Sequence, residues 1–107
     1  MKLFLTVTAL GTALLVMGSG VAWAQGDGKD LYMNKCATCH GPDGNAKTAM
    51  GRKLKVKAAQ AVVGSMSVEA MTKIVADGKG PDMDAYGKQF KPEQIKALVD
   101  YYRSLGK

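Results

Sequence analysis

Two cysteines and the only histidine of this 107-residue chain stand together, as Cys36, Cys39 and His40. Thiols and imidazoles form disulfides, bind metal ions or attach cofactors. A disulfide between Cys36 and Cys39 would close so small a loop that it would stabilise the chain very little. Zinc takes four protein ligands in structural sites, and this group offers three. A thioredoxin-like redox pair comes with a strand-rich βαβ pattern, which the surrounding sequence lacks.

The remaining interpretation of Cys36-Ala37-Thr38-Cys39-His40 is the attachment site of a c-type haem. Residues three apart on a helical turn project from the same face, so both thiols reach the vinyl groups of one haem edge and form two thioethers. His40 then places its imidazole on the iron. Because the chain has no second histidine, a second imidazole ligand from the same chain is excluded and only one haem is held in this way.

A methionine is the expected ligand on the other side of the iron. Met83 follows Gly78-Lys79-Gly80-Pro81-Asp82, a stretch that cannot be helical and predicts a loop crossing the haem face. A thioether suits haem iron and raises the reduction potential relative to a second imidazole. Met33 and Met71 have helical spacing and are expected in the core, whereas the pattern does not exclude Met50 or Met66. A lysine ligand or an open sixth position is also compatible with the sequence.

Residues 1–24 have the pattern of a secretory signal peptide. Lys2 precedes an uncharged stretch from Leu3 to Met17, and the small residues Ala22 and Ala24 predict cleavage before Gln25. The expected location is therefore the periplasm, and residues 25–107 form the folded domain. If this segment is removed, no stable membrane insertion is expected. An uncleaved anchor from Leu3 to Ala24 is the competing interpretation.

Short helices must position these groups. The first predicted helix covers residues 28–36 and follows Asp27, and a short helical turn is expected at 58–63. The next predicted helix, 67–76, has Ser67 as its N-cap and Gly78 beyond its end. The last, 92–105, begins at Pro92 and is terminated by Gly106. Ile95, Leu98, Val99, Tyr102 and Leu105 form an apolar stripe on the last helix. No alternating pattern demands a sheet. Since 83 residues make only a small core, a covalent haem would supply the missing apolar body.

The domain resembles the small soluble bacterial class I c-type cytochromes over nearly its whole length. The matching motifs are Gly28-x-x-x-Tyr32, Cys36-x-x-Cys39-His40-Gly41, Asp43-Gly44, Ile74-x-x-x-Gly78, Met83, Phe90, Glu93 and the closing segment 98–105. The resemblance implies an all-α fold around one covalent haem c, ligation by His40 and Met83, and contact between Gly28 and Tyr101 where the first helix crosses the last. Many members place proline after the ligand methionine, whereas Asp84 follows Met83 here.

The resemblance further implies an electron carrier that moves single electrons between redox partners and has no catalytic acid or base. Residues 25–107 carry 14 basic and 9 acidic side chains. Cations near an exposed haem edge would steer a partner with an acidic surface. Candidate cations are Arg52, Lys53, Lys55 and Lys57 with Lys47 nearby, and Lys79, Lys88, Lys91 and Lys96; some of residues 52–57 instead suit the haem propionates. Nucleic acid is not an expected partner of an exported chain, and a monomer is favoured.

Two further functions are compatible with the sequence. The first is a haem sensor or a peroxidase-like protein, in which the sixth position is open or its ligand is displaceable. The second is a haem subunit of a larger oxidoreductase, tethered to the membrane by an uncleaved N-terminal segment. Carbon monoxide binding distinguishes the sensor or peroxidase from an electron carrier, and N-terminal sequencing of the exported protein distinguishes the tethered subunit.

Overall fold

A computed structural model describes residues 25–107, which form six helices. They are α1 (Gln25–Lys35), α2 (Ala37–His40), α3 (Ala49–Lys53), α4 (Ala59–Val63), α5 (Val68–Asp77) and α6 (Pro92–Leu105). Pairing between extended segments in this part of the chain is limited to an isolated bridge between Lys79 and Met83. The all-α prediction is therefore confirmed. The predicted signal segment, residues 1–24, lies outside the described residues.

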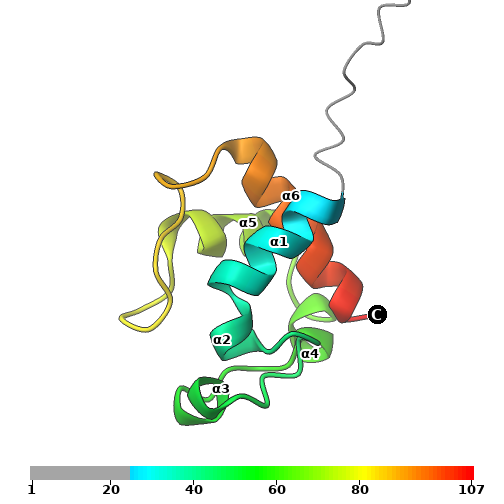
Figure 1. The fold of residues 1–107 in the computed structure, drawn as a ribbon, viewed down its shortest axis with the longest axis vertical. Coiled ribbons are helices and arrows are strands. Elements are labelled where there is room, and N and C mark those ends of the chain that lie inside the picture. Colours follow the sequence, from blue (N-terminus) through cyan, green and yellow to red (C-terminus); the bar gives the residue numbers. More distant parts are fainter. Residues whose placement is uncertain (1–24) are drawn as a thin grey trace, which may run out of the picture.

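Helices α1 and α6 cross each other and form the main helix pair of the fold (Figure 1). Gly28 makes the crossing possible, because a Cβ atom at this position would stand only 2.7 Å from the carbonyl carbon of Ala97. The predicted crossing at Gly28 is thus confirmed, although the nearest atoms belong to the backbone of Ala97 and Leu98. Tyr101 packs instead on the ring of Tyr32, with the ring centroids 5.3 Å apart.

The two longest helices predicted after the cysteine segment, 67–76 and 92–105, are confirmed as α5 and α6, with their ends within one residue of the expected positions. Pro92 occupies the first turn of α6 and Gly106 follows its last turn. Ser67 caps α5, since its hydroxyl accepts a hydrogen bond of 3.1 Å from the backbone N–H of Ala70. Gly78, with φ of 79°, ends α5 in a conformation that favours glycine. These local signals therefore predicted both elements well.

Two boundaries and one helix differ from the prediction. Helix α1 begins at Gln25, so Asp27 lies in its first turn and is not the cap. The helix ends at Lys35, and Cys36 joins it to α2. Helix α3 was not predicted. Its signal was Thr48, whose hydroxyl accepts a hydrogen bond of 2.9 Å from the N–H of Gly51. The predicted short turn at 58–63 is confirmed as α4.

The core joins α1, α5 and α6. Its buried members are Tyr32, Cys36, Met71, Val75, Ile95, Leu98 and Val99. The predicted stripe on α6 supplies three of them, and Tyr102 and Leu105 pack against the cluster as half-buried residues. Among residues 25–107, no helix has the length and apolar character needed to cross a membrane.

Candidate functional site

A cavity of about 680 Å³ lies between the helices and the loop that precedes α6. Its wall combines the segments around Cys36–His40, residues 54–57, α5, the loop 79–86 and α6. Apolar side chains dominate this wall: Leu54, Val56, Val62, Met66, Met71, Ile74, Val75, Leu98 and Val99. Cofactor pockets typically measure about 300–1,000 Å³ and are mainly apolar. All four predicted haem-binding residues, Cys36, Cys39, His40 and Met83, line it.

The backbone at the α1–α2 junction holds the two cysteines and the histidine on the cavity wall. The N–H of Cys36 donates to the carbonyl of Tyr32 at 2.8 Å, which continues the helical turn beyond Lys35. The N–H groups of Cys39 and His40 both donate to the carbonyl of Cys36, at 3.2 and 2.9 Å. One turn of backbone therefore positions all three side chains.

Both cysteines are free thiols. Burial, together with the neighbouring Cys39, raises the pKa of Cys36 to about 11. Redox-active Cys-x-x-Cys pairs work with a lowered thiol pKa, because the thiolate is the attacking species. The environment of Cys36 is the opposite of that arrangement.

His40 is partly buried, and burial lowers the pKa of its imidazole. A neutral imidazole is the form that binds iron. Its Nδ1 atom is buried without a hydrogen-bond partner. The ring of Tyr102 packs edge-on against it, with the centroids 5.4 Å apart and the planes at 76°.

Met83 sits in a loop that is tied back at both ends. The N–H of Lys79 donates to the carbonyl of Met83 at 3.0 Å, and the N–H of Met83 donates to the carbonyl of Lys79 at 3.3 Å. Beyond the loop, the N–H groups of Tyr86 and Gly87 donate to the carbonyls of Val75 and Ala76 at the end of α5, both at 2.9 Å. The half-buried Met83 therefore lies in a defined loop on the cavity wall, without a proline after it.

The structure separates the remaining methionines. Met71 is buried in the core, as predicted, and also lines the cavity. Met66, which the sequence did not exclude, is half-buried and lines the cavity too. Met50 is 38% exposed on α3 and does not line it. Met33 is partly buried against the core.

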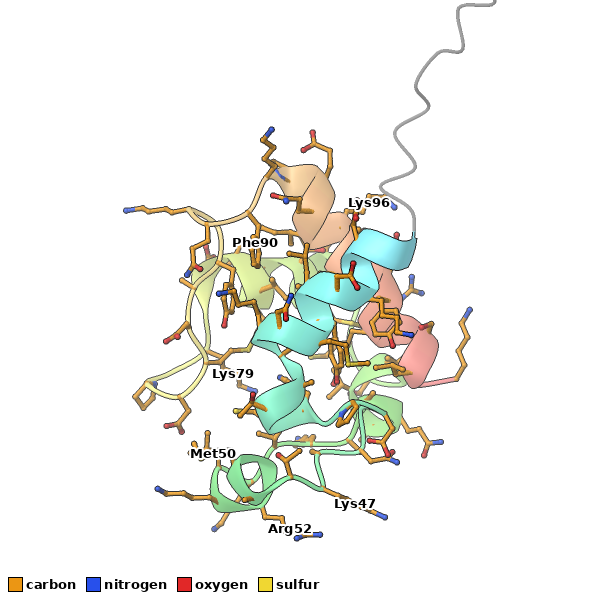
Figure 2. The ribbon with its side chains drawn as sticks, in the orientation of Figure 1. Lys47, Met50, Arg52, Lys79, Phe90 and Lys96 are labelled. Carbon is orange, nitrogen blue, oxygen red and sulfur yellow. The ribbon has the colours of Figure 1, made fainter. Side chains whose placement is uncertain are left out.

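Only some of the candidate cations stand at the cavity. Lys55, Lys57 and Lys79 line it, and so does Lys35, which was not predicted from the sequence. Lys47 and Arg52 extend from the end of the molecule that carries α3, far from Lys96 at the other end (Figure 2). Lys96 is moreover paired with Asp100 at 2.8 Å. The acidic residues Asp82 and Asp84 share the cavity wall with the four lysines.

Two tyrosines beside the site were not assigned a site role from the sequence. Tyr32 is fully buried and its hydroxyl donates to the carbonyl of Gly41, next to His40. Tyr102 lines the cavity, its hydroxyl is buried without a partner, and burial raises its pKa above the usual value. The sequence signal for Tyr102 was a phenol ring in the apolar stripe of α6, at a position where an aliphatic residue would also fill the core.

These observations fit a haem. The cavity has the size and apolar lining for a cofactor, two thiols project from one turn, and an imidazole with an orphaned Nδ1 stands next to them. Among residues 25–107, no three His, Cys, Asp or Glu side chains gather into a group that would hold a bare metal ion. Two free thiols and an imidazole on the wall of one apolar cavity suit a haem attached through thioethers.

Comparison with known proteins agrees with this fit. Residues 24–101 match the family model described as cytochrome c oxidase, cbb3-type, subunit III. The chain is 31% identical over 74 residues to cytochrome c6 of Bryopsis maxima, covering 69% of this chain and 83% of that protein. It is 32% identical over 79 residues to the cbb3-type cytochrome c oxidase subunit FixP of Azorhizobium caulinodans, covering 74% of this chain. The matched region is about a quarter (26%) of the FixP subunit.

A solved structure shares both fold and sequence. The KustC0563 c-type cytochrome superposes with a TM-score of 0.69 at 32% identity, covering 76% of this chain and 99% of that one. A covalently bound haem c and electron transfer are the shared properties of this family. The chain belongs to the c-type cytochromes, as a small class I member that matches the cbb3-type subunit III family model.

Proposed function

We propose that this cytochrome is a periplasmic carrier of single electrons whose one haem is attached through Cys36 and Cys39 and ligated by His40 and Met83. The observation that carries the proposal is that these four residues, from two separate segments, line one apolar cavity. The proposed roles are attachment for the thiols, proximal ligation for the imidazole and control of the reduction potential for the thioether.

The chain contributes rigidity and an apolar surrounding to electron transfer. Haem iron, when bound, takes up and releases one electron. The turn at Cys36–His40 holds His40, and a loop with backbone hydrogen bonds at both ends holds Met83. The two proposed ligands therefore need to move little when the charge on the iron changes. The aliphatic wall limits access of water to the site. If His40 and Met83 both bound the iron, no ligand position would remain for a substrate, which distinguishes a carrier from a sensor or peroxidase.

The proposed partner is a redox protein with an acidic surface. Lys35, Lys55, Lys57 and Lys79 line the cavity and would face such a partner at its mouth. Cationic groups at this position raise the rate of encounter more than the affinity. The basic balance of residues 25–107 supports this proposal.

Export to the periplasm is proposed from the sequence. Residues 1–24 are interpreted as a cleaved signal and residues 25–107 as the cytochrome domain. Sequencing of the N-terminus of the exported protein tests this boundary, because Gln25 at the terminus is expected. An intact N-terminus at Met1 would indicate a retained anchor.

A second candidate function has a specific observation in its favour. The family model and the FixP match both describe cbb3-type oxidase subunits. The same electron transfer would then take place inside a membrane complex, with this chain as a tethered haem subunit. Purification from membranes and from the periplasmic fraction distinguishes the two candidates, because a carrier is recovered in the periplasmic fraction.

Visible spectra of the oxidised and reduced protein, with and without carbon monoxide, test the ligand set. We expect the wild type to show a Met-to-iron charge-transfer band and little carbon monoxide binding. Met83→Ala removes the thioether, so the band disappears and carbon monoxide binds to the ferrous protein. Met50→Ala serves as control because Met50 does not line the cavity.

Three outcomes would contradict the proposed ligand set. An unchanged band in Met83→Ala excludes Met83 as the ligand, and loss of the band in Met66→Ala would transfer that role to Met66. A wild-type ferrous protein that binds carbon monoxide readily favours a sensor or peroxidase.

A further inference from the structure

The net positive charge of the domain comes from one segment. Residues 44–68 carry five basic side chains and no acidic one, whereas the rest of residues 25–107 carries nine of each. The five cations are all exposed, and they are Lys47, Arg52, Lys53, Lys55 and Lys57. Lys55 and Lys57 line the haem cavity, while Lys47, Arg52 and Lys53 do not. The positive charge that a partner senses from a distance is therefore concentrated around α3.

The cations around α3 do not form ion pairs. Within the part of the chain that the structure describes, the one ion pair joins Lys96 and Asp100, both on α6. Asp43 is the carboxylate closest in sequence to Lys47, and it instead accepts two hydrogen bonds of 3.0 Å from the backbone and side-chain amides of Asn45. The positive charge of the 44–68 segment is therefore available to an anion from outside the domain.

Met50 places an apolar side chain among these cations. Among residues 25–107 it is the one large hydrophobic residue that is exposed. It lies between Lys47 and Arg52 in the sequence, and Figure 2 shows the three at the same end of the molecule. A single apolar residue on a surface needs no explanation by itself. A methionine inside a basic surface is different, because protein interfaces combine an apolar centre, enriched in methionine, with a polar rim.

Helix α3 packs directly on the turn that carries the haem-attachment residues. The hydroxyl of Thr48 donates to the carbonyl of Cys39 at 3.2 Å and accepts a hydrogen bond of 2.9 Å from the N–H of Gly51. Gly51 is buried, and a Cβ atom there would clash with the carbonyl oxygens of Cys39 and Ala46. The backbones of α3 and of the Cys39 turn are therefore in close contact. A protein seated on the exposed side of α3 would be separated from the haem-attachment turn by this short helix.

We propose that the redox partner docks on the α3 surface, which consists of Met50 and the cations Lys47, Arg52 and Lys53 around it. The partner that fits is a protein whose acidic patch encloses an apolar contact for Met50. The cations accelerate and orient the encounter, and Met50 supplies apolar area at the contact. One electron then passes between the two redox centres, without transfer of a proton or an atom. The inference rests on the proposed electron carrier and its acidic partner, and it names where that partner binds.

The mouth of the cavity attracts an acidic patch less strongly. There Lys35 and Lys79 share the wall with Asp82 and Asp84, so attraction and repulsion partly cancel. The α3 surface belongs to a segment without a carboxylate side chain. Charge complementarity therefore favours α3 over the mouth as the main contact.

An acidic peptide serves as the probe of the α3 surface. The peptide carries glutamates on both sides of one leucine, and a second peptide has serine in place of the leucine. Each is added to the reduced, haem-loaded protein labelled with ¹⁵N, and the amide chemical shifts locate the contact. We expect the largest shifts at residues 47–53 and tighter binding of the leucine peptide. The shifts should vanish at about 1 M salt, where the screening length falls to about 3 Å.

Variants test the charge and the apolar contact separately. Arg52→Glu, Lys53→Glu is expected to weaken binding of both peptides roughly 10-fold. Met50→Gln keeps the length of the side chain and should weaken binding of the leucine peptide alone, by about fourfold, as for the loss of one buried methylene group. The matched control Lys73→Glu, Lys88→Glu makes the same change in net charge at exposed residues outside the α3 surface and the cavity wall, so a much smaller loss is expected. Circular dichroism of each variant checks its fold.

Several outcomes would overturn the inference. Peptide shifts centred on Lys35 and Lys79 would place the partner at the mouth, and equal losses in both double variants would assign the binding to total charge. Equal affinity of the wild type for the two peptides would remove the apolar contact.

A lipid surface and the proposed function are tested on the same protein. Binding of phosphatidylcholine–phosphatidylglycerol vesicles through residues 47–53, without peptide binding there, would overturn the protein partner in favour of an anionic membrane. That result and those above leave the proposed haem ligation intact, because visible spectra report the ligands independently. A wild-type ferrous protein that binds carbon monoxide readily would overturn the proposed carrier and this inference together.

Discussion

The hydroxyl of Tyr32 donates a hydrogen bond of 2.5 Å to the carbonyl oxygen of Gly41. Tyr32 lies on α1 and is fully buried, while Gly41 directly follows His40. The bond therefore ties the first helix to the far end of the cysteine-histidine segment, nine residues along the chain. The same ring packs against Tyr101 and Tyr102 of α6, with centroid distances of 5.3 and 6.2 Å. Tyr32 thus links the α1–α6 crossing to the haem site.

Tyr32→Phe tests this link. The variant keeps the ring contacts and leaves the buried carbonyl of Gly41 with the N–H of Gly44, at 3.1 Å, as its remaining donor. We therefore expect a loss of about 0.5–1.5 kcal/mol in the free energy of unfolding. Chemical denaturation of the haem-loaded protein measures it. Tyr101→Phe is the matched control, because the Tyr101 hydroxyl makes no hydrogen bond within residues 25–107. Equal stability of the Tyr32→Phe protein and the wild type would show that the bond contributes nothing.

Gly28→Ala should disrupt the crossing of α1 and α6. The added Cβ would meet the backbone of Ala97, which cannot move without shifting α6. Overpacking of this kind costs about 1–3 kcal/mol, and thermal unfolding measures the loss. Gly64→Ala is the control: its Cβ would come no closer than 3.3 Å to the carbonyl oxygen of Gln60, and its φ of −73° suits alanine. A larger loss in Gly64→Ala than in Gly28→Ala would contradict the packing argument.

Removal of the haem should unfold most of the domain. The double variant Cys36→Ala, Cys39→Ala lacks both thioether anchors. The empty apolar cavity of about 680 Å³ then leaves a small core that cannot stabilise the fold of 83 residues. Far-ultraviolet circular dichroism is expected to lose most of its helical signal. Each single variant keeps one thioether and should keep that signal. A native-like spectrum of the double variant without haem would be the contrary result.

Charge reversal at the cavity should slow the encounter with an acidic partner. Lys55→Glu and Lys79→Glu are each expected to lower the association rate roughly 2- to 10-fold at low ionic strength and to flatten its salt dependence. Stopped-flow measurements across a range of salt concentrations check this. Lys107→Glu makes the same charge change at a residue that does not line the cavity. If Lys107→Glu lowers the association rate equally, the total charge of the protein, and not the position of the lysines, governs that rate.

The local features of this fold could be predicted from the sequence. Ser67 and Gly78 bound α5, Pro92 and Gly106 bound α6, and the spacing from Cys36 to His40 indicated the haem-attachment segment. Each of these signals acts within a few residues, through capping, backbone restriction or helical spacing. Helix α3 carried such a signal at Thr48 and was still missed, because a five-residue helix has too few turns for an apolar pattern.

The composition of the cavity wall was decided only by the tertiary structure. The crossing of α1 over α6 at Gly28 brings Tyr102 beside His40, although 62 positions separate the two residues in the sequence. In the same way, the wall contains Met66 and Lys35, whereas Met50 and Lys96 lie elsewhere. No periodicity contains this information, because the distance between remote side chains depends on how the helices pack. The sequence alone therefore determined the kind of chemistry, and the packing decided which side chains surround it.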